Sequence, residues 1–508
     1  MRNVDERKVA EAGGGASARP MLAGDRGGFV DRHDLWTEAM YASAGQMRRV
    51  MDEVGIEMVQ FVFADQHGIL RGKTLARSAV PEAMRSGIRV PSSLLLKDTS
   101  GRSVFAVFDP AGLGELGRFA GAGDVVLVPD PTTFRILPWT ERTGLVLCSL
   151  YFPDGAPVPF CTRGILRDRL AALAERDLGL TVGAELEFHV FRSDPAGFSP
   201  ERVGRPGAPG AAPVAAPTTP GAQLLHAEAL GDLDDLVQAL YSGLTRMDLP
   251  LRTLELEFGP SQLELTMDAG DAARVADDVV LVRTAVRQIA RKLGYHATFM
   301  SRPVGAETAS TGWHLHQSLR NLLTGANVFA AEPGTGEVLS DTGRFYLGGL
   351  LEHATAAAAF STPTVNGYKR YQPYSLAPDR VVWGVDNKGA MVRAVGTPGD
   401  PSSRLENRSG EPAANPYLYI VAQLVSGMDG VDRTIDPGPP AENPYENDAK
   451  RLPSNLGEAV DALESDQVFR AAFGDEVIAW YARIKRTEFH RYLAHVSDWE
   501  QREYFALV

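Results

Sequence analysis

Three segments of alternating apolar and polar side chains constrain this chain more than any other feature. They are residues 181–192 (TVGAELEFHVFR), 251–267 (LRTLELEFGPSQLELTM) and 311–319 (TGWHLHQSL). Alternation with a period of two is typical of β-strands with one buried face. The second segment is interrupted by residues 259–261 (GPS), which predicts a hairpin.

Side chains two residues apart on a strand point to the same face. The pairs that share a face are Glu185 and Glu187, Glu255 and Glu257, and His314 and His316. On strands packed side by side these acids would crowd together, and two carboxylates about 4 Å apart repel by about 4 kcal/mol at an effective dielectric near 20. Such a cluster requires cations. Its oxygen-rich set suits magnesium or manganese better than zinc or copper, and it comprises Glu185, Glu187, Glu257, Glu264, Glu406 and His314.

Each motif taken alone also has an ordinary structural explanation. A Glu-Leu-Glu strand is more often a solvated sheet face, and a His-Leu-His strand more often carries paired or surface histidines. Asp65, at the turn in ADQHG, would by itself be a turn residue. The co-occurrence of three such strands with an arginine-rich segment favours a functional site.

That arginine-rich segment runs from residue 366 to residue 408, amid glycines, prolines and apolar residues. Its basic residues are Lys369, Arg370, Arg380, Lys388, Arg393, Arg404 and Arg408. The guanidinium fork suits bidentate capture of carboxylate and phosphate, although a loop-rich surface with ordinary ion pairs is the alternative. The net charge of −13 argues against a nucleic-acid partner. Local arginines in an acidic protein indicate a small anionic ligand.

The length and the cysteine content bound the class of protein. A chain of 508 residues is expected to form two or more domains. Cys148 and Cys161 provide neither a disulfide framework nor zinc spacing, so a reducing cytoplasm is expected. No apolar run reaches about 18 residues, and the N-terminus lacks the apolar core of a signal peptide. No membrane partner is expected.

Changes in composition divide the chain into four predicted parts. Residues 1–34 are interpreted as a disordered extension, 35–155 as a small α+β domain and 156–508 as a larger domain, with a mobile Pro/Ala/Gly-rich insertion at 193–221. Residues 57–75 predict a hairpin. Helices are predicted at 36–54, 162–178, 232–247, 274–293, 346–360, 416–426, 456–463 and 476–493.

Several segments together resemble the signature segments of the glutamine synthetase family, in order and spacing. They are GAELEF, the E-x6-E pair in EFGPSQLE, GWHLHQSL, NGYKR and RLENRSGEPAANPYL. The resemblance covers about residues 36–508, including an ending (VSDWEQREYFALV) that looks like the family's C-terminal tail. It implies an α+β fold, with a small β-grasp-like N-terminal domain and a large catalytic domain of antiparallel strands and helices. It also implies homo-oligomers in which hexameric rings pair into a dodecamer, with active sites between subunits.

The resemblance also implies roles for single residues. It implies two to three Mg²⁺ or Mn²⁺ ions, one near the acid and amine substrates held by Glu187, Glu257 and Glu264, and one bridging the phosphates of ATP held by Glu185, His314 and Glu406. Nucleotide-binding positions are matched by His316, Ser318, Arg393 and Arg404, with Lys388 where the family usually has arginine. Arg370 and Arg408 match residues that hold the amino-acid carboxylates. Asp65, offered by the adjacent subunit, matches the aspartate of the ammonium pocket.

The activity implied is an ATP-dependent ligation of glutamate to an amine. A carboxylate does not condense with an amine in water, whereas a γ-glutamyl phosphate formed from ATP can be attacked by an uncharged amine. Arg393 and Arg404, with divalent ions, would neutralise the transferred phosphoryl group. An ammonia-using glutamine synthetase is the alternative. A non-catalytic structural relative is a second one, although such a protein would have no chemical reason to retain six metal ligands.

Two departures from the family bear on the substrates. In glutamine synthetases proper, the motif after NGYKR contains a glutamate that helps to bind ammonium, and Leu376 stands at that position here. Because an apolar residue cannot balance an ammonium ion, the sequence predicts a substituted amine. Tyr371 and Tyr374, near Leu376 in the sequence, favour an apolar or aromatic amine. Residues 309–312 (ASTG) replace the usual Asn-Gly before the first histidine, so the identity of the acid is left open. Tyr445 is not expected to be adenylylated.

Overall fold

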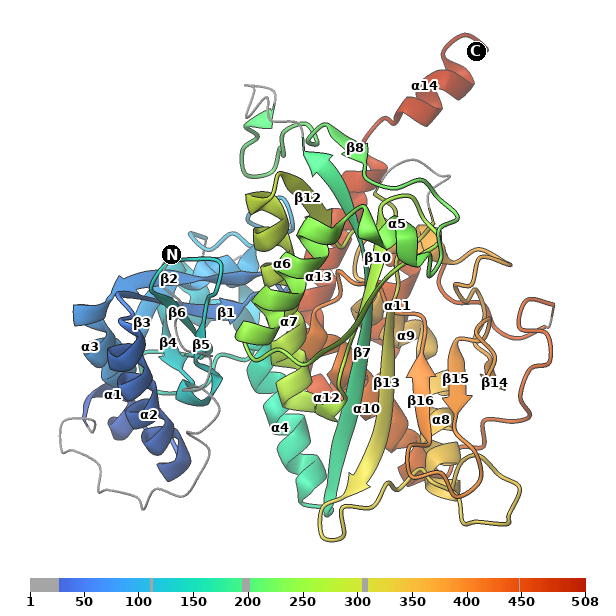
Figure 1. The fold of residues 1–508 in the computed structure, drawn as a ribbon, viewed down its shortest axis with the longest axis horizontal. Coiled ribbons are helices and arrows are strands. Elements are labelled where there is room, and N and C mark those ends of the chain that lie inside the picture. Colours follow the sequence, from blue (N-terminus) through green and yellow to red (C-terminus); the bar gives the residue numbers. More distant parts are fainter. Residues whose placement is uncertain (1–26, 110–112, 194–201, 304–308, 447) are drawn as a thin grey trace.

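A computed structural model of the chain describes residues 27–109, 113–193, 202–303, 309–446 and 448–508, and it contains two β-sheets (Figure 1). The smaller sheet has the order β2-β1-β6-β4-β3, with β5 paired to β6, and β1 runs parallel to β6. Its strands are β1 (Met58–Ala64), β2 (Leu70–Ala76), β3 (Ile88–Pro91), β4 (Asp124–Pro129), β5 (Arg135–Ile136) and β6 (Thr143–Tyr151).

The larger sheet is built around the long strand β7. Its main path is β14-β15-β16-β13-β7-β10-β9, and β8, β11 and β12 also pair with β7. Within the described residues β14–β15 is the one parallel pair in this sheet. Its strands are β7 (Leu178–Ser193), β8 (Ala215–Pro217), β9 (Leu251–Leu256), β10 (Gln262–Met267), β11 (Gly270–Asp271), β12 (Tyr295–Thr298), β13 (Trp313–Asn321), β14 (Trp383–Val385), β15 (Val392–Val395) and β16 (Arg404–Asn407).

Helices lie beside both sheets, and α10 contacts α4, α7, α8 and α9 in the helical layer beside the larger sheet (Figure 1). None of the helices in the described part of the chain combines the length and the apolar character needed to span a bilayer. The helices are α1 (Gly28–Arg32), α2 (Glu38–Val54), α3 (Val80–Ser86), α4 (Thr162–Ala174), α5 (Ala227–Gly231), α6 (Asp234–Arg246), α7 (Ala272–Lys292), α8 (Asp341–Glu352), α9 (Ala354–Ser361), α10 (Pro416–Arg433), α11 (Leu456–Ser465), α12 (Gln467–Phe473), α13 (Asp475–Leu493) and α14 (Asp498–Tyr504).

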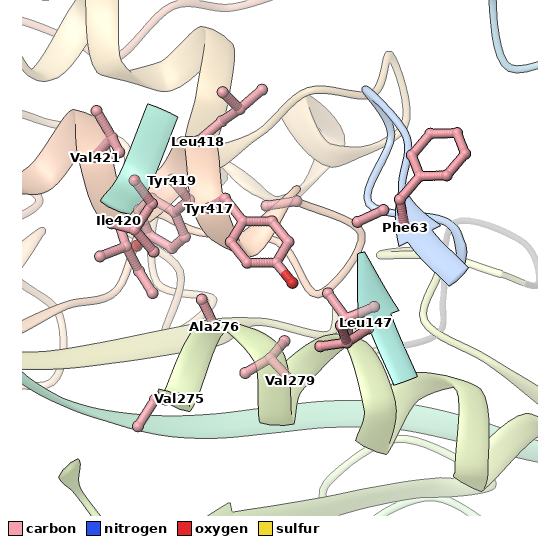
Figure 2. Packing of buried hydrophobic residues seen from close by; sticks show 14 of the residues in the cluster. Phe63, Leu147, Val275, Ala276, Val279, Tyr417, Leu418, Tyr419, Ile420 and Val421 are labelled. Carbon is pink, nitrogen blue, oxygen red and sulfur yellow. The ribbon is translucent and has the colours of Figure 1, made fainter. Parts of the chain in front are cut away.

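One apolar core extends from the smaller sheet into the helices of the larger domain. Figure 2 shows Tyr417 of α10 facing Ala276 and Val279 of α7, with Leu147 of β6 beside them. Burial of a side chain of this size contributes about 1.5–3 kcal/mol. This shared packing fixes the smaller sheet against the larger domain.

A buried ionic network crosses the same region. Arg163 of α4 bonds to Asp277 of α7 at 2.8 Å and to Asp130, at the end of β4, at 2.9 Å. The hydroxyl of Tyr417 donates to Asp277 at 2.7 Å. Because both carboxylates and the guanidinium are bonded, their burial is compensated and the geometry between the two parts of the chain is specified.

Most predicted elements are confirmed, including the 57–75 hairpin, formed by β1 and β2, and the hairpin of β9 and β10. The single helix predicted over residues 346–360 is wrong, because α8 and α9 are separate helices that meet at His353. The ring of His353 bonds to Asp466 at 2.7 Å and to Asp429 at 2.8 Å. These non-local contacts fix a break that the periodicity does not reveal.

Two segments that were expected to lack regular structure each contain one helix or strand. The expected extension 1–34 contains α1, and its Phe29 and Val30 are buried against the first domain. Within the insertion 193–221, β8 pairs with the end of β7. Apolar burial and free hydrogen-bonding edges explain both corrections. Residues 1–26 and 194–201, the rest of these two predictions, lie outside the described residues.

Candidate active site

The register of the larger sheet brings the predicted acids and histidines together. The directly opposed pairs are Glu187 with Glu264, Glu185 with His314, and His316 with Glu406. We refer to these six residues as the strand cluster. Because a slip of one residue would turn every side chain to the other face, the register of β7 against β10 and β13 determines whether the cluster exists.

The side chains of the strand cluster are in close contact. His314 Nδ1 lies 2.5 Å from Glu185 Oε1, and His314 Nε2 lies 3.7 Å from Glu187 Oε1. His316 Nε2 lies 3.4 Å from Glu185 Oε2. His314 Nδ1 is also 3.8 Å from Glu406 Oε1. The two histidines therefore link acids that belong to different strands.

Burial and like charge disfavour the simultaneous ionisation of several carboxylates in the strand cluster. Burial, and then the charge of Glu257, raise the pKa of Glu187 to about 8. Burial, and then the charge of Glu185, raise the pKa of Glu264 to about 10. Burial, and then the charge of Arg408, lower the pKa of His314, which favours the neutral imidazole that binds metals. These carboxylates would ionise readily only beside an added cation.

Two sets of donor atoms converge enough to hold such a cation. One set is Glu185, Glu264 and His314, the other is Glu185, His316 and Glu406, and within each set the donor atoms lie within 4.8 Å of one another. Carboxylate oxygens with a single imidazole fit Mg²⁺ or Mn²⁺. His316 therefore emerges as a candidate ligand in addition to its expected role in nucleotide binding.

Glu187 and Glu257 belong to neither set of converging donors among the described residues. Glu187 Oε2 instead accepts hydrogen bonds from Gln262 Nε2 and from the backbone N–H of Gly312, both at 2.9 Å. Sequence reasoning missed Gln262. It lies two residues before Glu264 on the same face of β10, so the period of two could have identified it.

Glu255 is a second residue that was not assigned to the site. It lies directly opposite Glu264 in the register of β9 and β10, and burial raises its pKa. The Glu-Leu-Glu pattern puts Glu255 and Glu257 on one face, but it does not show which of them lies opposite Glu264. Glu257 lies one residue beyond the end of β9 and has a raised pKa, first because of burial.

The arginines expected to bind phosphate lie on the strands next to the cluster. Arg393 Nη1 donates to Glu406 Oε2 at 2.9 Å, and Arg393 Nε donates to Asp386 Oδ1 at 2.9 Å. Arg404 Nε donates to His316 Nδ1 at 3.2 Å. Arg408 also pairs with Glu406. Glu406 therefore pairs with two arginines, Arg393 and Arg408. In the sequence it also lies between two arginines, Arg404 and Arg408.

A cavity of about 800 Å³ opens beside these arginines. Its volume lies in the range of sites for nucleotide-sized ligands. Among its lining residues are Glu185, His316, Ser318, Arg393 and Arg404. The structure thus brings four of the five predicted nucleotide contacts to one cavity.

Lys388, the fifth predicted nucleotide contact, does not line this cavity in the described part of the chain. Its side chain is exposed, and its charge acts on Glu257 instead. It lies in the loop between β14 and β15, at the opposite end of β15 from the cavity. A single-residue match in a loop does not fix the direction of a long flexible side chain.

The two arginines expected at the glutamate site are buried. Arg370 Nη1 donates to the carbonyl oxygens of Ser409 and Gly410 at 3.0 and 2.8 Å. Arg370 Nε and Arg408 Nε have no hydrogen-bond partner among the described residues. Each arginine therefore retains an N–H that can donate a hydrogen bond to a substrate carboxylate.

Asp65 is not brought to the strand cluster within the chain. Its carboxylate is 2% exposed and closes its own turn, because it accepts from the N–H groups of His67 and Ile69 at 2.9 and 3.0 Å. Arg71 Nε donates to its other oxygen at 2.9 Å. Within one chain Asp65 therefore acts as a turn residue, and its role in the amine pocket of an adjacent subunit stays a prediction.

The segment around Leu376 is an exposed loop with unusual backbone. Tyr374 and Leu376 have φ angles of 58° and 59°, and their side chains are 68% and 49% exposed. Positive φ is strained for residues with side chains. The Tyr374 ring lies 5.0 Å from the ring of Tyr445, whose hydroxyl donates to Ala377 O at 3.3 Å. Tyr371 does not share this surface, because its hydroxyl bonds inward to Ser409 O at 3.0 Å.

Comparison with known proteins places this geometry among related enzymes. The family model described as glutamine synthetase, catalytic domain matches residues 159–504. The chain is 40% identical over 496 residues to a gamma-glutamylanilide synthase from Acinetobacter sp, covering 94% of this chain and 99% of that protein. It is 32% identical to a gamma-glutamylethanolamide synthetase from Streptomyces coelicolor, covering 89% of this chain and 93% of that protein. The solved ADP complex of GmaS, 28% identical, superposes with a TM-score of 0.75 and covers 91% of this chain and 99% of that one.

Proposed function

This chain belongs to the glutamine synthetase family, and we propose that its amine substrate is an aromatic amine. The enzyme is an ATP-dependent ligase that joins the γ-carboxylate of glutamate to an organic amine. The reaction passes through γ-glutamyl phosphate and yields a γ-glutamylamide, ADP and phosphate. What remains to be assigned is the amine.

The observation that carries the assignment is the exposed Leu376 beside Tyr374, at the position where ammonia-using relatives have a glutamate. An alkylammonium ion needs a negative partner, and leucine supplies none. An aromatic amine is uncharged at neutral pH because its ring withdraws the nitrogen lone pair. Its ring can pack on an apolar and aromatic surface. The similarity to a gamma-glutamylanilide synthase over nearly the whole chain supports the same choice.

The residues of the site suggest how the acid is activated. We assign the glutamate carboxylates to Arg370 and Arg408, each of which keeps an N–H without a partner in the described part of the chain. Arg393 and Arg404 line the nucleotide cavity, where their guanidinium groups would hold the γ-phosphoryl group and stabilise the charge that develops during transfer. Glu406 keeps Arg393 in place by accepting its hydrogen bond.

Divalent cations complete the proposed site. Glu185, Glu264, His314, His316 and Glu406 would hold Mg²⁺ or Mn²⁺, with Glu187 and Glu257 close by. The bound ions would neutralise the charge of the phosphate oxygens. The number of ions and the choice between the two metals belong to this proposal.

The assembly and the location are also part of the proposal. Relatives in the family suggest a homo-oligomer of hexameric rings, up to a dodecamer, with sites between subunits. Cys148 and Cys161 are both free and buried, which is compatible with a reducing cytoplasm.

The test is a substrate panel. Purified protein would be incubated with ATP, Mg²⁺, glutamate and one of aniline, isopropylamine, ethanolamine, putrescine or ammonium, and phosphate release and product mass would be measured. We expect aniline or a substituted aniline to give the highest kcat/KM and a γ-glutamylanilide product. Higher activity with ammonium than with any organic amine would overturn the proposal.

A further inference from the structure

Tyr445 contacts the loop of residues 371–379 on both sides of Leu376. Its ring lies 5.0 Å from the ring of Tyr374, with an angle of 40° between the two planes. Its hydroxyl donates to the carbonyl oxygen of Ala377 at 3.3 Å. Tyr374 comes two residues before Leu376 and Ala377 comes one residue after it. The two contacts therefore hold the chain around Leu376, whose own side chain is 49% exposed.

The backbone of this loop needs support from its surroundings. Tyr374 and Leu376 have φ angles of 58° and 59°. A left-handed conformation at a residue with a side chain costs about 1–3 kcal/mol, and it persists only where neighbouring contacts stabilise it. Tyr445 lies about 70 residues further along the chain, so its contacts with the loop are tertiary contacts that the local sequence does not supply.

A second tertiary contact joins the same two segments. The hydroxyl of Tyr374 donates to the carboxylate of Glu446, the residue after Tyr445. This hydrogen bond is the largest cause of the raised pKa of Tyr374, so the hydroxyl stays protonated at neutral pH and keeps donating. We refer to Tyr445 and Glu446 as the brace.

Backbone hydrogen bonds attach the chain on either side of the brace to the edge of the larger sheet. Before the brace, the N–H of Ala441 donates to the carbonyl oxygen of Trp383, in β14, at 2.8 Å. After the brace, the carbonyl oxygen of Lys450 accepts from the N–H of Val381 at 2.8 Å. The sheet thus sets the position of the brace, and the brace supports the loop.

The ring of Tyr445 also packs against the loop between β14 and β15. A Cβ atom placed on Gly389 in that loop would lie 3.0 Å from Tyr445 Cε2, closer than two carbon atoms normally approach. Gly389 therefore leaves the space that the ring occupies. Tyr445 is held by the loop of the sheet and in turn contacts the strained loop that presents Leu376.

We propose that Tyr445 is a positioning residue that determines amine selectivity by holding Leu376 in place. The inference rests on the proposed function, in which Leu376 meets the organic part of the amine. Tyr445 acts through the loop and not by touching the reacting atoms. The hydrogen bonds described above for Arg370 and Arg393 do not involve Tyr445. Loss of its ring should therefore impair use of the amine more than use of glutamate or ATP.

The test compares Tyr445→Leu, which removes the ring and the hydroxyl, with Tyr445→Phe, which keeps the ring. The KM values for aniline, ATP and glutamate would be measured for each variant. We expect Tyr445→Leu to raise the KM for aniline about 10-fold or more and to change the other two less than about threefold. Tyr445→Phe should raise the KM for aniline by about threefold at most, because only one long hydrogen bond is lost. Tyr241→Leu, at a site 58% exposed on α6, is the matched control.

Hydrogen exchange provides a second readout that needs no substrate. The amides of residues 371–379 should exchange faster in Tyr445→Leu than in the wild type, because the loop loses its tertiary support. Exchange in β7 and β13 should be unchanged if the variant is folded. An unchanged exchange rate in the loop would show that other contacts hold it, and this would overturn the inference.

The kinetic outcomes separate this inference from the proposed function. Equal changes in all three KM values, a fall in kcat alone, or an unchanged KM for aniline in Tyr445→Leu would each overturn the role of Tyr445. Wild-type protein that uses ammonium and no organic amine would refute the proposed function instead. In that case a selective rise in the KM for ammonium in Tyr445→Leu would still support Tyr445 as a positioning residue, and its absence would overturn both.

Discussion

The strand cluster and the loop of residues 371–379 contribute to one active site in opposite ways. The cluster crowds acids and histidines onto regular strands, and its members face one another directly across the sheet. The loop presents Leu376 and Tyr374, exposed and in strained backbone. In the function proposed above, the chemistry common to the family depends on sheet register, whereas the choice of amine depends on this loop.

The difference also concerns what each region lacks. Glu187 and Glu264 of the strand cluster lack a close cation, and their pKa values are raised to about 8 and about 10. The loop has an apolar side chain at Leu376 and no carboxylate at that position. Four predictions test this contrast, from the largest expected effect to the smallest.

Removal of divalent cations should abolish activity, because the strand cluster cannot hold ATP phosphates beside its own negative charge. We expect dialysis against a chelator to lower phosphate release by at least about 1,000-fold, in line with the large role of metal ions in such transfers. Added Mg²⁺ or Mn²⁺ should restore the rate. Full activity after exhaustive chelation, with metal content checked by mass spectrometry, would contradict the assignment of these residues.

Loss of a phosphate-binding arginine should have the next largest effect. Arg393→Gln should lower kcat by about 100- to 1,000-fold, because a donor aimed at developing charge is removed. The same fall is expected with every amine, since the loop is untouched. Arg344→Gln, which pairs with Asp436 on the surface, serves as control. Steady-state kinetics with aniline and with ammonium would expose an amine-dependent effect, which would argue against this role.

Restoring a charge in the loop should alter the preference for the amine rather than the general activity. We expect Leu376→Glu to lower kcat/KM for aniline by about 10- to 100-fold, as for other changes of a single group in an apolar pocket. It should raise kcat/KM for ammonium. Leu323→Glu, at a site 77% exposed, is the matched control. A uniform fall for all amines would indicate damage to the fold and not a change in specificity.

The smallest effect is expected at His353, whose ring is already bonded to two carboxylates. Although burial opposes it, hydrogen bonds to Asp466 and Asp429 raise the pKa of His353 above its ordinary value of 6.5. A raised pKa in the folded state means that this stabilisation is complete below pH 6.5 and is lost as the pH rises through the folded-state pKa. The loss should be about 1 kcal/mol, the net contribution typical of a hydrogen bond, because burial of the imidazole offsets part of the gain from its two carboxylates.

Thermal unfolding across pH 6 to 9 would measure this effect. The wild-type Tm should fall relative to that of His353→Gln as the pH rises, and the two curves should converge at high pH. Parallel curves would show that His353 contributes no titrating stabilisation, in contrast to the strand cluster.

Much of the site could be predicted from residue types and spacing. Glu185, Glu187, Glu264 and His314 lie on segments where period-two alternation assigns a face to each side chain, whereas Glu406 was identified from the arginine-rich segment that resembles the family. The role of Gln262 could have been found by the same rule. The roles of Asp65 and Lys388 stay predictions, because both lie in turns or loops, where spacing does not determine the direction of a side chain.

The sequence by itself determined the strands, the acid-rich faces, the family and the unusual residue at position 376, because each is a local pattern or an identity. The tertiary structure decided the register that opposes Glu187 to Glu264 and Glu185 to His314, and the packing of the first sheet on α7 and α10. These features depend on contacts between residues far apart in the chain. Their energies arise from burial and from the pairing of charges, which appear only when the segments meet.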